Sequence, residues 1–232
     1  MNIGIIVAMS SEQKQLAKEL TDKSERQIGH FNYLIGKGEK NTFILMQAGI
    51  GKVNAAVGTM ELIQNFHPDC IISTGVAGGI DTCLHVMDVV VSEEIVYHDV
   101  WCGEGNAYGQ VQGLPATFKG NETLYQAAMN LDSETPIHGG LICSGDKFIT
   151  DRKELNEIKN KFPQGLAVEM ESGAIAQVCH IYNVPFLSFR IISDTPGATS
   201  DHFAQYQNFW DEMANRSFQV TKTFLHALPS KL

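Results

Sequence analysis

The chain has 232 residues, of which 44% are hydrophobic and 19% are charged, and its formal net charge is −9. These values are typical of a globular protein with a sizeable core and exclude an intrinsically disordered chain. Because the chain is acidic and has no basic cluster, nucleic acid and anionic membranes are poor candidates as partners. The five cysteines are scattered and form no Cys-x-x-Cys pair, which argues against both a disulfide framework and a zinc site.

The N-terminal segment, residues 1–9, is apolar but lacks the basic residues that begin a secretory signal peptide, so it predicts a first core strand. No apolar run approaches the length that crosses a bilayer. We therefore expect a cytoplasmic protein. No repeat, low-complexity tract or linker interrupts the sequence, which predicts a single domain over residues 1–232.

Strand-like and helix-like patterns alternate along the chain. The strand at 2–8 leads into a helix near Ser10, where Ser10 and Gln13 have the spacing of a capping box and Glu12 falls in the first turn. Further strands are expected at 31–36, 42–48, 69–74, 86–96, 137–143 and 186–192, and further helices from 49–52 to about 66, at 121–131 and at 151–160.

Two more segments complete this pattern. Residues 97–118 lack periodicity and predict a long functional loop. Apolar side chains from Phe203 to Leu228, mostly three or four residues apart, predict a long C-terminal helix. Strands that alternate with helices, together with an early hairpin, predict a three-layer α/β/α sandwich with a central mixed sheet.

The glycine-rich segment at 49–52 departs from both common phosphate-binding motifs. Met46 and Val53 stand where a Walker loop needs glycine and Ser or Thr, and Asn54 stands where a dinucleotide fingerprint needs glycine or alanine. Glycines that open a helix close to the sheet are the simpler interpretation. For the glycine-rich segment at 75–79, which follows a buried strand, a close backbone approach to a ligand and a plain turn are about equally compatible.

Two further kinds of chemistry find no support in the sequence. The eight histidines include no His-Glu-x-x-His pair, so a metal site is not expected. The chain also lacks a Gly-x-Ser-x-Gly nucleophile elbow, and the segment that begins at Ser144 lacks the upstream glycine of that motif. Serine-dependent or metal-dependent hydrolysis is therefore disfavoured.

Carboxylates remain as the chemistry-bearing groups. Glu12, Glu171 and Asp194 each follow an apolar strand-like segment, and ligands of open α/β sheets bind at the carboxyl ends of the strands. Singly, each has a structural explanation: Glu12 as a first-turn helix charge, Glu171 as a helix-start acid, and Asp194 as a cap or an ion-pair partner of Arg190. Together they predict a site where crowding raises the pKa of one acid, which donates a proton, while another acid deprotonates water. Such acids can cleave a glycosidic-type bond through a cationic transition state.

Seven segments, in order, resemble the bacterial 5′-methylthioadenosine/S-adenosylhomocysteine nucleosidases of the nucleoside phosphorylase superfamily. They are Gly4-Ile-Ile-Val-Ala-Met9 with Glu12, Ala48-Gly-Ile-Gly-Lys-Val-Asn54, Thr74-Gly-Val-Ala-Gly-Gly79, Tyr97-His-Asp99, Ser144-Gly-Asp-Lys-Phe-Ile149, Val168-Glu-Met-Glu171 and Arg190-Ile-Ile-Ser-Asp194. The resemblance extends from Gly4 into the C-terminal helix. It implies a nucleoside phosphorylase-like fold and an irreversible hydrolysis of the N-ribosidic bond of 5′-modified adenosines, without a cofactor.

The resemblance also implies roles for individual residues. Glu12 would activate water, while Asp194, held by Ser193, would protonate or hydrogen-bond N7 of the leaving adenine. Glu171 would bind the ribose hydroxyls and stabilise the oxocarbenium ion. The remaining expected contacts are Met170 against the sugar, Phe148 and the backbone of Ile149 at the adenine, Arg190 near the water, and Met9, Ile50 and an aromatic residue from Phe203 to Tyr206 around the sugar and 5′ region.

Two departures from the family pattern bear on specificity. Val76 stands where many members carry a serine near the water and the ribose, so that hydrogen bond is expected to be missing. Residues 100–113 match the family poorly, although in the family this loop reaches the neighbouring subunit's 5′ pocket. The resemblance therefore implies a homodimer with loop 97–118 at the interface, while the preferred 5′ substituent stays open.

Two alternative functions stand beside the hydrolase. A phosphorolytic relative would use phosphate in place of water, but the acid Glu12 near the nucleophile would repel that anion. A non-catalytic nucleoside-binding module would need no proton donor beside a base, so the trio of acids argues against it.

Overall fold

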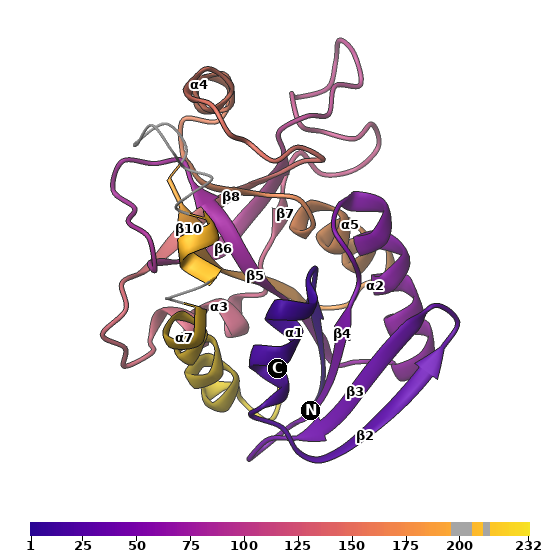
Figure 1. The fold of residues 1–232 in the computed structure, drawn as a ribbon. Coiled ribbons are helices and arrows are strands. Elements are labelled where there is room, and N and C mark those ends of the chain that lie inside the picture. The colour runs from indigo at the N-terminus through magenta and orange to yellow at the C-terminus, as the bar shows by residue number, and fades with distance from the viewer. Residues whose placement is uncertain (196–205, 211–213) are drawn as a thin grey trace.

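The structure is a computed structural model of the 232-residue chain and describes residues 1–195, 206–210 and 214–232. Over these residues a mixed sheet of ten strands runs through the molecule, with helices on both of its faces (Figure 1). The strands are β1 (Asn2–Val7), β2 (Thr21–Ile28), β3 (Phe31–Lys37), β4 (Thr42–Gln47), β5 (Cys70–Gly79), β6 (Val89–Tyr97), β7 (Phe118–Lys119), β8 (Ile137–Ser144), β9 (Gly165–Glu169) and β10 (Phe186–Asp194). The helices are α1 (Ser10–Ala17), α2 (Lys52–Phe66), α3 (Glu122–Met129), α4 (Arg152–Lys161), α5 (Ser172–Tyr182) and α7 (Ala214–Ala227).

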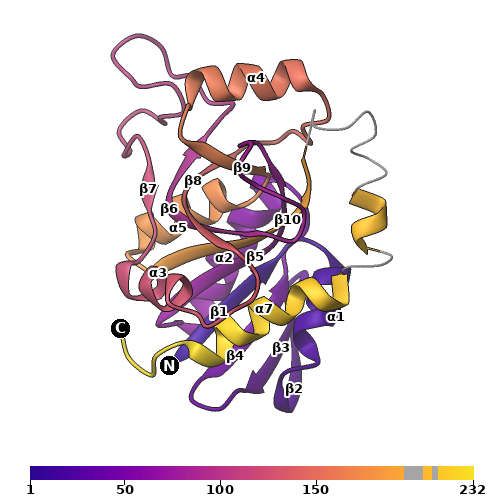
Figure 2. The ribbon, with the colours of Figure 1, turned by 90° about the vertical axis from the view of Figure 1, so that its left-hand side faces the viewer.

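The layered α/β architecture predicted from the sequence is confirmed, because apolar side chains alternate between two cores. Along β1, Ile3 and Ile5 belong to the core under α1, α3 and α7, whereas Ile6 belongs to the core under α2 and α5. All nine residues of β10 are buried, as expected of a strand that is covered on both faces. Figure 2 shows α4 at the end of the molecule opposite α7, where it covers a third, smaller core.

Half of the sheet closes on itself. β5 pairs with both β10 and β9, while β10 pairs with β6, β6 with β8, and β8 with β9, so these five strands form a ring. From β5 the sheet continues outward as β1, β4, β3 and β2. β1, β5 and β10 are mutually parallel, so their carboxyl ends lie at one edge of the sheet. Because β9 runs antiparallel to β5, its last residues come back beside the end of β5.

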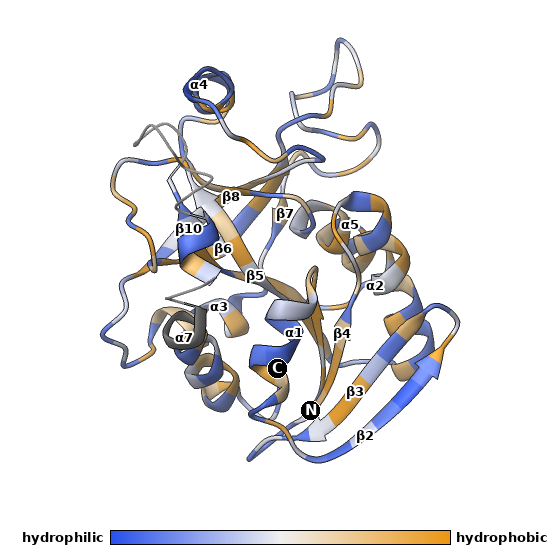
Figure 3. Ribbon diagram, in the orientation of Figure 1, coloured by the Kyte–Doolittle hydropathy of each residue, from blue (hydrophilic) through white to orange (hydrophobic). Residues whose placement is uncertain are grey.

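Three elements differ from the sequence-based expectation. The strand predicted to end at residue 74 continues to Gly79, because the glycine-rich segment pairs with β10 and β9 and forms no turn. β2 was not predicted, since it is an edge strand of polar, mostly exposed residues and carries no apolar alternation, as the blue ribbon in Figure 3 shows. β9 was not predicted either; it is a strand of only five residues that follows a turn at Pro163 and Gln164.

The predicted capping residue of the first helix was wrong by one position. Met9 has extended backbone angles and precedes the helix, while Ser10 is already helical. Glu12, three residues after Met9, accepts the Met9 N–H at 2.9 Å and so takes the reciprocal position of a capping box. This local geometry points the Glu12 carboxylate back toward the end of β1.

The predicted loop at 97–118 and the predicted C-terminal helix have different outcomes. Between β6 and β7 the chain is irregular, as predicted for a loop. The helix is confirmed over α7, where Phe224 stacks on Phe189 of β10 with ring centroids 4.6 Å apart. Phe203 and Met213 lie outside the described residues. None of the helices in the described part of the chain is long and apolar enough to cross a membrane.

Candidate active site

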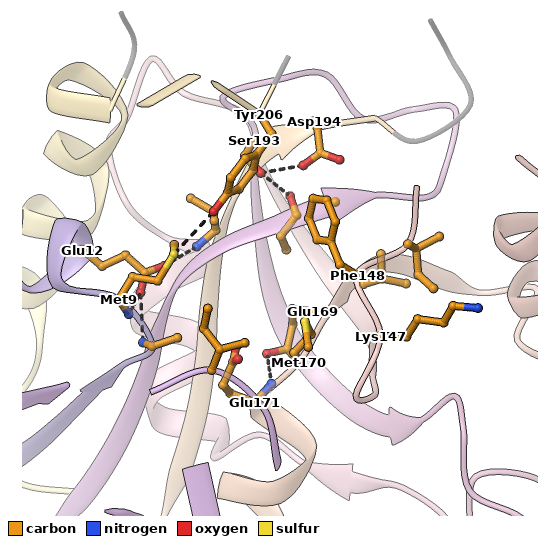
Figure 4. Close-up of a pocket in the computed structure, with 17 residues that line it drawn as sticks. Met9, Glu12, Lys147, Phe148, Glu169, Met170, Glu171, Ser193, Asp194 and Tyr206 are labelled. Carbon is orange, nitrogen blue, oxygen red and sulfur yellow. Dashed lines mark hydrogen bonds between the residues drawn. The ribbon is translucent and has the colours of Figure 1, made fainter. Parts of the chain in front are cut away.

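A pocket opens at the sheet edge where β1, β5 and β10 end and where β9 returns (Figure 4). Segment 144–149 and the turn at Ile50 form two of its walls, and Tyr206 lies across a third. The lining residues are Ala8, Met9, Glu12, Ile50, Val76, Ala77, Gly78, Lys147, Phe148, Ile149, Val168, Glu169, Met170, Glu171, Ser193, Asp194 and Tyr206.

This pocket brings together most of the residues that the sequence indicated. Those that line it are Met9, Glu12, Ile50, Val76, Phe148, Ile149, Met170, Glu171, Ser193 and Asp194. Arg190 is different, because it lies behind the wall and is 1% exposed. Phe203 lies outside the described residues, whereas Tyr206, the other end of the aromatic stretch considered for the 5′ region, lines the pocket.

Glu12 is held by backbone N–H groups on three sides. Its Oε2 accepts from Ala8 and Met9, both at 2.9 Å, and its Oε1 accepts from Val76 at 3.2 Å. Burial raises the pKa of Glu12 above its usual value, and the positive charge of Arg190 and these three N–H groups partly oppose that shift. The carboxylate is therefore fixed in place and has a raised proton affinity, as a general base requires.

Gly75 of β5 lies between Glu12 and Arg190, where there is no room for a side chain. A Cβ atom at this position would lie 2.4 Å from Glu12 Oε1 and 2.9 Å from Arg190 Nη1. Its φ of +148° is also a backbone conformation that side-chain-bearing residues rarely adopt. Only glycine lets the backbone pass between the acid and the guanidinium. For this glycine-rich segment, the close backbone approach considered from the sequence is therefore directed at Glu12.

The guanidinium of Arg190 is paired with Glu169, which the sequence had not singled out as a site residue. Nη2 lies 2.7 Å from Glu169 Oε2, and both side chains are almost completely buried. The same guanidinium donates to three serine hydroxyls, of Ser73 at 2.7 Å, Ser172 at 2.9 Å and Ser188 at 3.2 Å. These contacts make Arg190 a structural anchor for the carboxylates, and its expected role in placing a water stays a prediction.

Glu171 stands at the pocket floor in a crowded field of charge. Its Oε1 accepts the Gly51 N–H at 2.9 Å, while its Oε2 is 3.9 Å from Arg190 Nη1. Burial and then the negative charge of Glu169 raise the pKa of Glu171 to about 7, against the opposing effect of Arg190. Glu169 in turn accepts the N–H groups of Glu171 and Ser172 at 3.0 and 2.8 Å, so it fixes the start of α5.

Asp194 lies on the side of the pocket away from Glu12, at the end of β10 (Figure 4). The hydroxyl of Ser193 donates to its Oδ1 at 2.7 Å. Phe148 extends into the space between Asp194 and the floor, and its ring meets the ring of Tyr206 edge to face at 5.5 Å. The Tyr206 hydroxyl reaches the Met9 sulfur at 3.4 Å. The pocket thus has an aromatic end near Asp194 and a thioether–phenol end near Glu12.

Glu169 and Lys147 are charged lining residues that stand in family-like segments of the sequence but were given no role from it. The sequence indicated that Arg190, the only charge in its strand-like run, would need an acidic partner in the core. It did not indicate which acid that partner would be. Among residues 1–195, 206–210 and 214–232, no three His, Cys, Asp or Glu side chains are grouped so that they could hold a metal ion.

Comparisons with known proteins place this geometry in a family. A family model described as the phosphorylase superfamily matches residues 2–226. A 5′-methylthioadenosine/S-adenosylhomocysteine nucleosidase of Actinobacillus succinogenes is 46% identical over 84% of this chain and 86% of its own length.

Solved structures of nucleosidases are similar in fold to this chain. A nucleosidase of the same name from Colwellia psychrerythraea, in complex with adenine, superposes with a TM-score of 0.93 at 35% identity, over 100% of this chain and 97% of that chain. The nucleosidase of S. pneumoniae with a transition-state inhibitor gives a TM-score of 0.92 at 36% identity, over 99% of this chain and 100% of that chain.

The raised pKa of Glu171 predicts a pH-dependent stability. An acid whose pKa is higher in the folded than in the unfolded state binds more protons when folded, so its contribution to stability falls as pH rises from about 4.5 to about 7. We expect the wild-type protein to lose, relative to Glu171→Gln, up to roughly 3 kcal/mol of unfolding free energy across this window. Urea titrations of both proteins between pH 4.5 and 8 measure the difference. A gap that is constant with pH would contradict the shift.

Proposed function

We propose a function for this chain from its family, because it belongs to the phosphorylase superfamily and, within it, to the 5′-methylthioadenosine/S-adenosylhomocysteine nucleosidases. The chain is a hydrolase of N-glycosyl compounds. Its substrates are 5′-methylthioadenosine, S-adenosylhomocysteine and related 5′-modified adenosines, from which it releases adenine. The observation that supports this most strongly is that four buried acids, Glu12, Glu169, Glu171 and Asp194, line one pocket.

Glu12 is the proposed general base. Water attacks the anomeric carbon of the ribose and transfers a proton to the Glu12 carboxylate, while the electron pair of the C–N bond leaves with adenine. The three backbone N–H groups hold the carboxylate in one orientation, and its burial increases its proton affinity. A fixed and partly desolvated base needs little reorganisation at the moment of proton transfer.

Asp194 is the proposed group at N7 of the leaving base. Adenine leaves poorly as an anion, so a proton or a strong hydrogen bond at N7 lowers the barrier. The Ser193 hydroxyl fixes one oxygen of Asp194, and Phe148 beside it offers a ring face on which a planar base can stack. The backbone of Ile149, next in the chain, would read the edge of the base.

The floor of the pocket suits a developing cation. As the C–N bond breaks, positive charge builds on the ribose, and the Glu171 carboxylate would stabilise it while binding the ribose hydroxyls. Met170 packs against the sugar in this arrangement. Around the 5′ substituent stand Met9, Ile50 and Tyr206, whose apolar surfaces and phenol suit a thioether. Val76 contributes an apolar side chain and, through its N–H, a hydrogen bond to Glu12.

The wider setting of the enzyme follows from the same proposal. Residues 1–232 would act as one catalytic domain that needs neither metal nor cofactor. A cytoplasmic location is supported by five cysteines that are all free thiols in the structure. The acidic surface makes nucleic acid and anionic membranes unsuitable partners.

A homodimer is the proposed assembly, with loop 97–118 at the interface. Large apolar side chains are exposed on two helices, Val53 and Val57 of α2 and Ile181 and Tyr182 of α5, and at Trp101 of the loop. α2 and α5 lie side by side (Figure 1), so four of these residues are on neighbouring helices. Val53 and Ile181 are 74% and 57% exposed, which is costly for aliphatic side chains that no partner covers.

The proposed reaction is tested by incubating the purified protein with 5′-methylthioadenosine and measuring free adenine by chromatography. We expect rapid release by the wild type, and turnover lowered by roughly 10²–10⁴-fold in Glu12→Gln and Asp194→Asn, since each removes a proton-transfer group. Glu25→Gln, an exposed acid on β2, is the matched control and should behave as the wild type. Nucleoside binding without adenine release by the wild type would favour the binding module, and near-normal rates in either acid variant would remove that acid from the mechanism.

The proposed dimer is tested by sedimentation equilibrium at working concentration. We expect the mass of two chains for the wild type, and dissociation with loss of activity for Val53→Glu, which puts a charge into the apolar contact. Gln27→Glu, which adds the same charge on the exposed strand β2, should remain dimeric. A fully active monomer would defeat both the interface and its contribution to the site.

A further inference from the structure

Three residues of the family motifs, to which the proposed reaction gives no role, meet beside the pocket. They are Lys52 at the start of α2, Asp99 at the start of loop 97–118, and Asp146 in segment 144–149. These residues are 47 positions apart in each successive pair, yet they contact one another directly. None of them lines the pocket.

Their contacts form a closed ring of three interactions. The Lys52 ammonium donates to Asp99 Oδ1 at 2.6 Å, and the other oxygen of Asp99 accepts the Asp146 N–H at 2.9 Å. The Asp146 carboxylate then accepts the Lys52 N–H at 2.7 Å. Every interaction in the ring has a charged partner, which makes such hydrogen bonds shorter and stronger than neutral ones. The Lys52 ammonium also lies 4.8 Å from the centre of the Tyr97 ring.

Each side of the ring is continuous with a wall of the pocket. On one side Gly51, next to Lys52, donates its N–H to Glu171 at 2.9 Å, and Ile50 before it lines the pocket. On the other side, Phe148 and Ile149 follow Asp146 by two and three residues and form the aromatic end. The ring therefore sets the separation between the turn that contacts Glu171 and the segment proposed to bind the base.

The backbone segments around the ring approach one another closely. A Cβ atom on Gly51 would lie 3.0 Å from Asp146 Oδ1, and one on Gly145 would lie 2.4 Å from His98 Nε2 and 2.9 Å from Asp99 Cγ. Glycine at both positions lets the three segments approach this closely. We expect a change in the ring to reach the pocket walls, because Ile50 and Phe148 lie within two residues of Lys52 and Asp146.

We propose that Asp99 and Lys52 are positioning residues that hold the base-binding segment 144–149 at a fixed distance from the Gly49–Lys52 turn. The inference rests on the proposed function and assigns these residues to the adenine end of the same site. They touch neither the substrate nor the reacting atoms. Glu12 and Asp194 are held by other contacts, and the ring reaches Glu171 only through the Gly51 N–H, so we expect the ring to affect binding of the base more than the chemical step.

The test compares Asp99→Asn, Lys52→Met and Lys52→Arg with the wild type. Asn is nearly isosteric with Asp but uncharged, Met removes the ammonium, and Arg restores a cation that can still reach Asp99. For Asp99→Asn and Lys52→Met we expect KM for 5′-methylthioadenosine and Kd for adenine to rise about tenfold, while kcat changes less than about threefold. Lys52→Arg should recover most of the affinity.

A matched control separates this role from general stabilisation. Lys159 of α4 makes an ion pair with Asp81 at 2.7 Å, and the two side chains are 24% and 29% exposed, against 21% and 30% for Lys52 and Asp99. Because Lys159 also donates to the carbonyls of Pro163 and Gly165, Lys159→Met should lower the melting temperature at least as much as Lys52→Met, without changing KM or the affinity for adenine.

Each outcome decides the inference. Unchanged KM and adenine affinity in Asp99→Asn and Lys52→Met would overturn it, as would an equal rise in KM for Lys159→Met. If Asp99→Asn fails to fold, Lys52→Met and its rescue by Lys52→Arg carry the test. Adenine release by the wild type, measured in the same assay, reports on the proposed function separately, so failure of the ring is distinguishable from failure of the enzyme.

Discussion

One buried guanidinium serves three buried carboxylates, and this imbalance of charge governs the site. Arg190 pairs closely with Glu169, lies 3.9 Å from Glu171 and acts on Glu12 across the thin wall at Gly75. Burial raises the pKa of Glu12 and of Glu171, the negative charge of Glu169 adds to the rise at Glu171, and the single positive charge of Arg190 opposes both rises only in part. The surplus negative charge favours a cationic ribose, and it opposes the entry of an anion. The same arrangement therefore supports both the transition state and the choice of water as nucleophile.

The closed half of the sheet makes this crowding possible. β5 contributes Ser73, Gly75 and Val76, and its pairing with β10 on one side and β9 on the other brings Arg190 and Glu169 into register beside it. Serine hydroxyls from β5, α5 and β10 complete the donors of Arg190, so the guanidinium is held in a single orientation within the core. Such a network is costly to desolvate, and its hydrogen bonds fix the positions of its members. The helices cover the outer faces of these strands.

Local patterns in the sequence were sufficient to find much of the fold and most of the pocket. Glu12, Glu171 and Asp194 follow apolar runs, and the rule that sites lie at strand ends is enough to predict that they come together. What local patterns could not supply was long-range pairing. The partner of Arg190, the closure of β10 onto β5, and the continuation of β5 to Gly79 depend on contacts between distant segments. β2 was not predicted because an exposed edge strand needs no apolar alternation. The helix cap lies at Met9, one residue before the predicted Ser10, because the Glu12 carboxylate accepts the Met9 N–H.

The charge imbalance is tested most directly by varying phosphate. A phosphate dianion that approaches Glu12 meets a repulsion of roughly 4 kcal/mol for each pair of unit charges at 4 Å, in an effective dielectric of about 20, whereas water meets none. Adenine release from 5′-methylthioadenosine should therefore proceed at its full rate in phosphate-free buffer and yield the free sugar, with no increase when phosphate is added. Sugar 1-phosphate that forms in proportion to added phosphate, with no adenine released in its absence, would contradict the account and identify a phosphorylase.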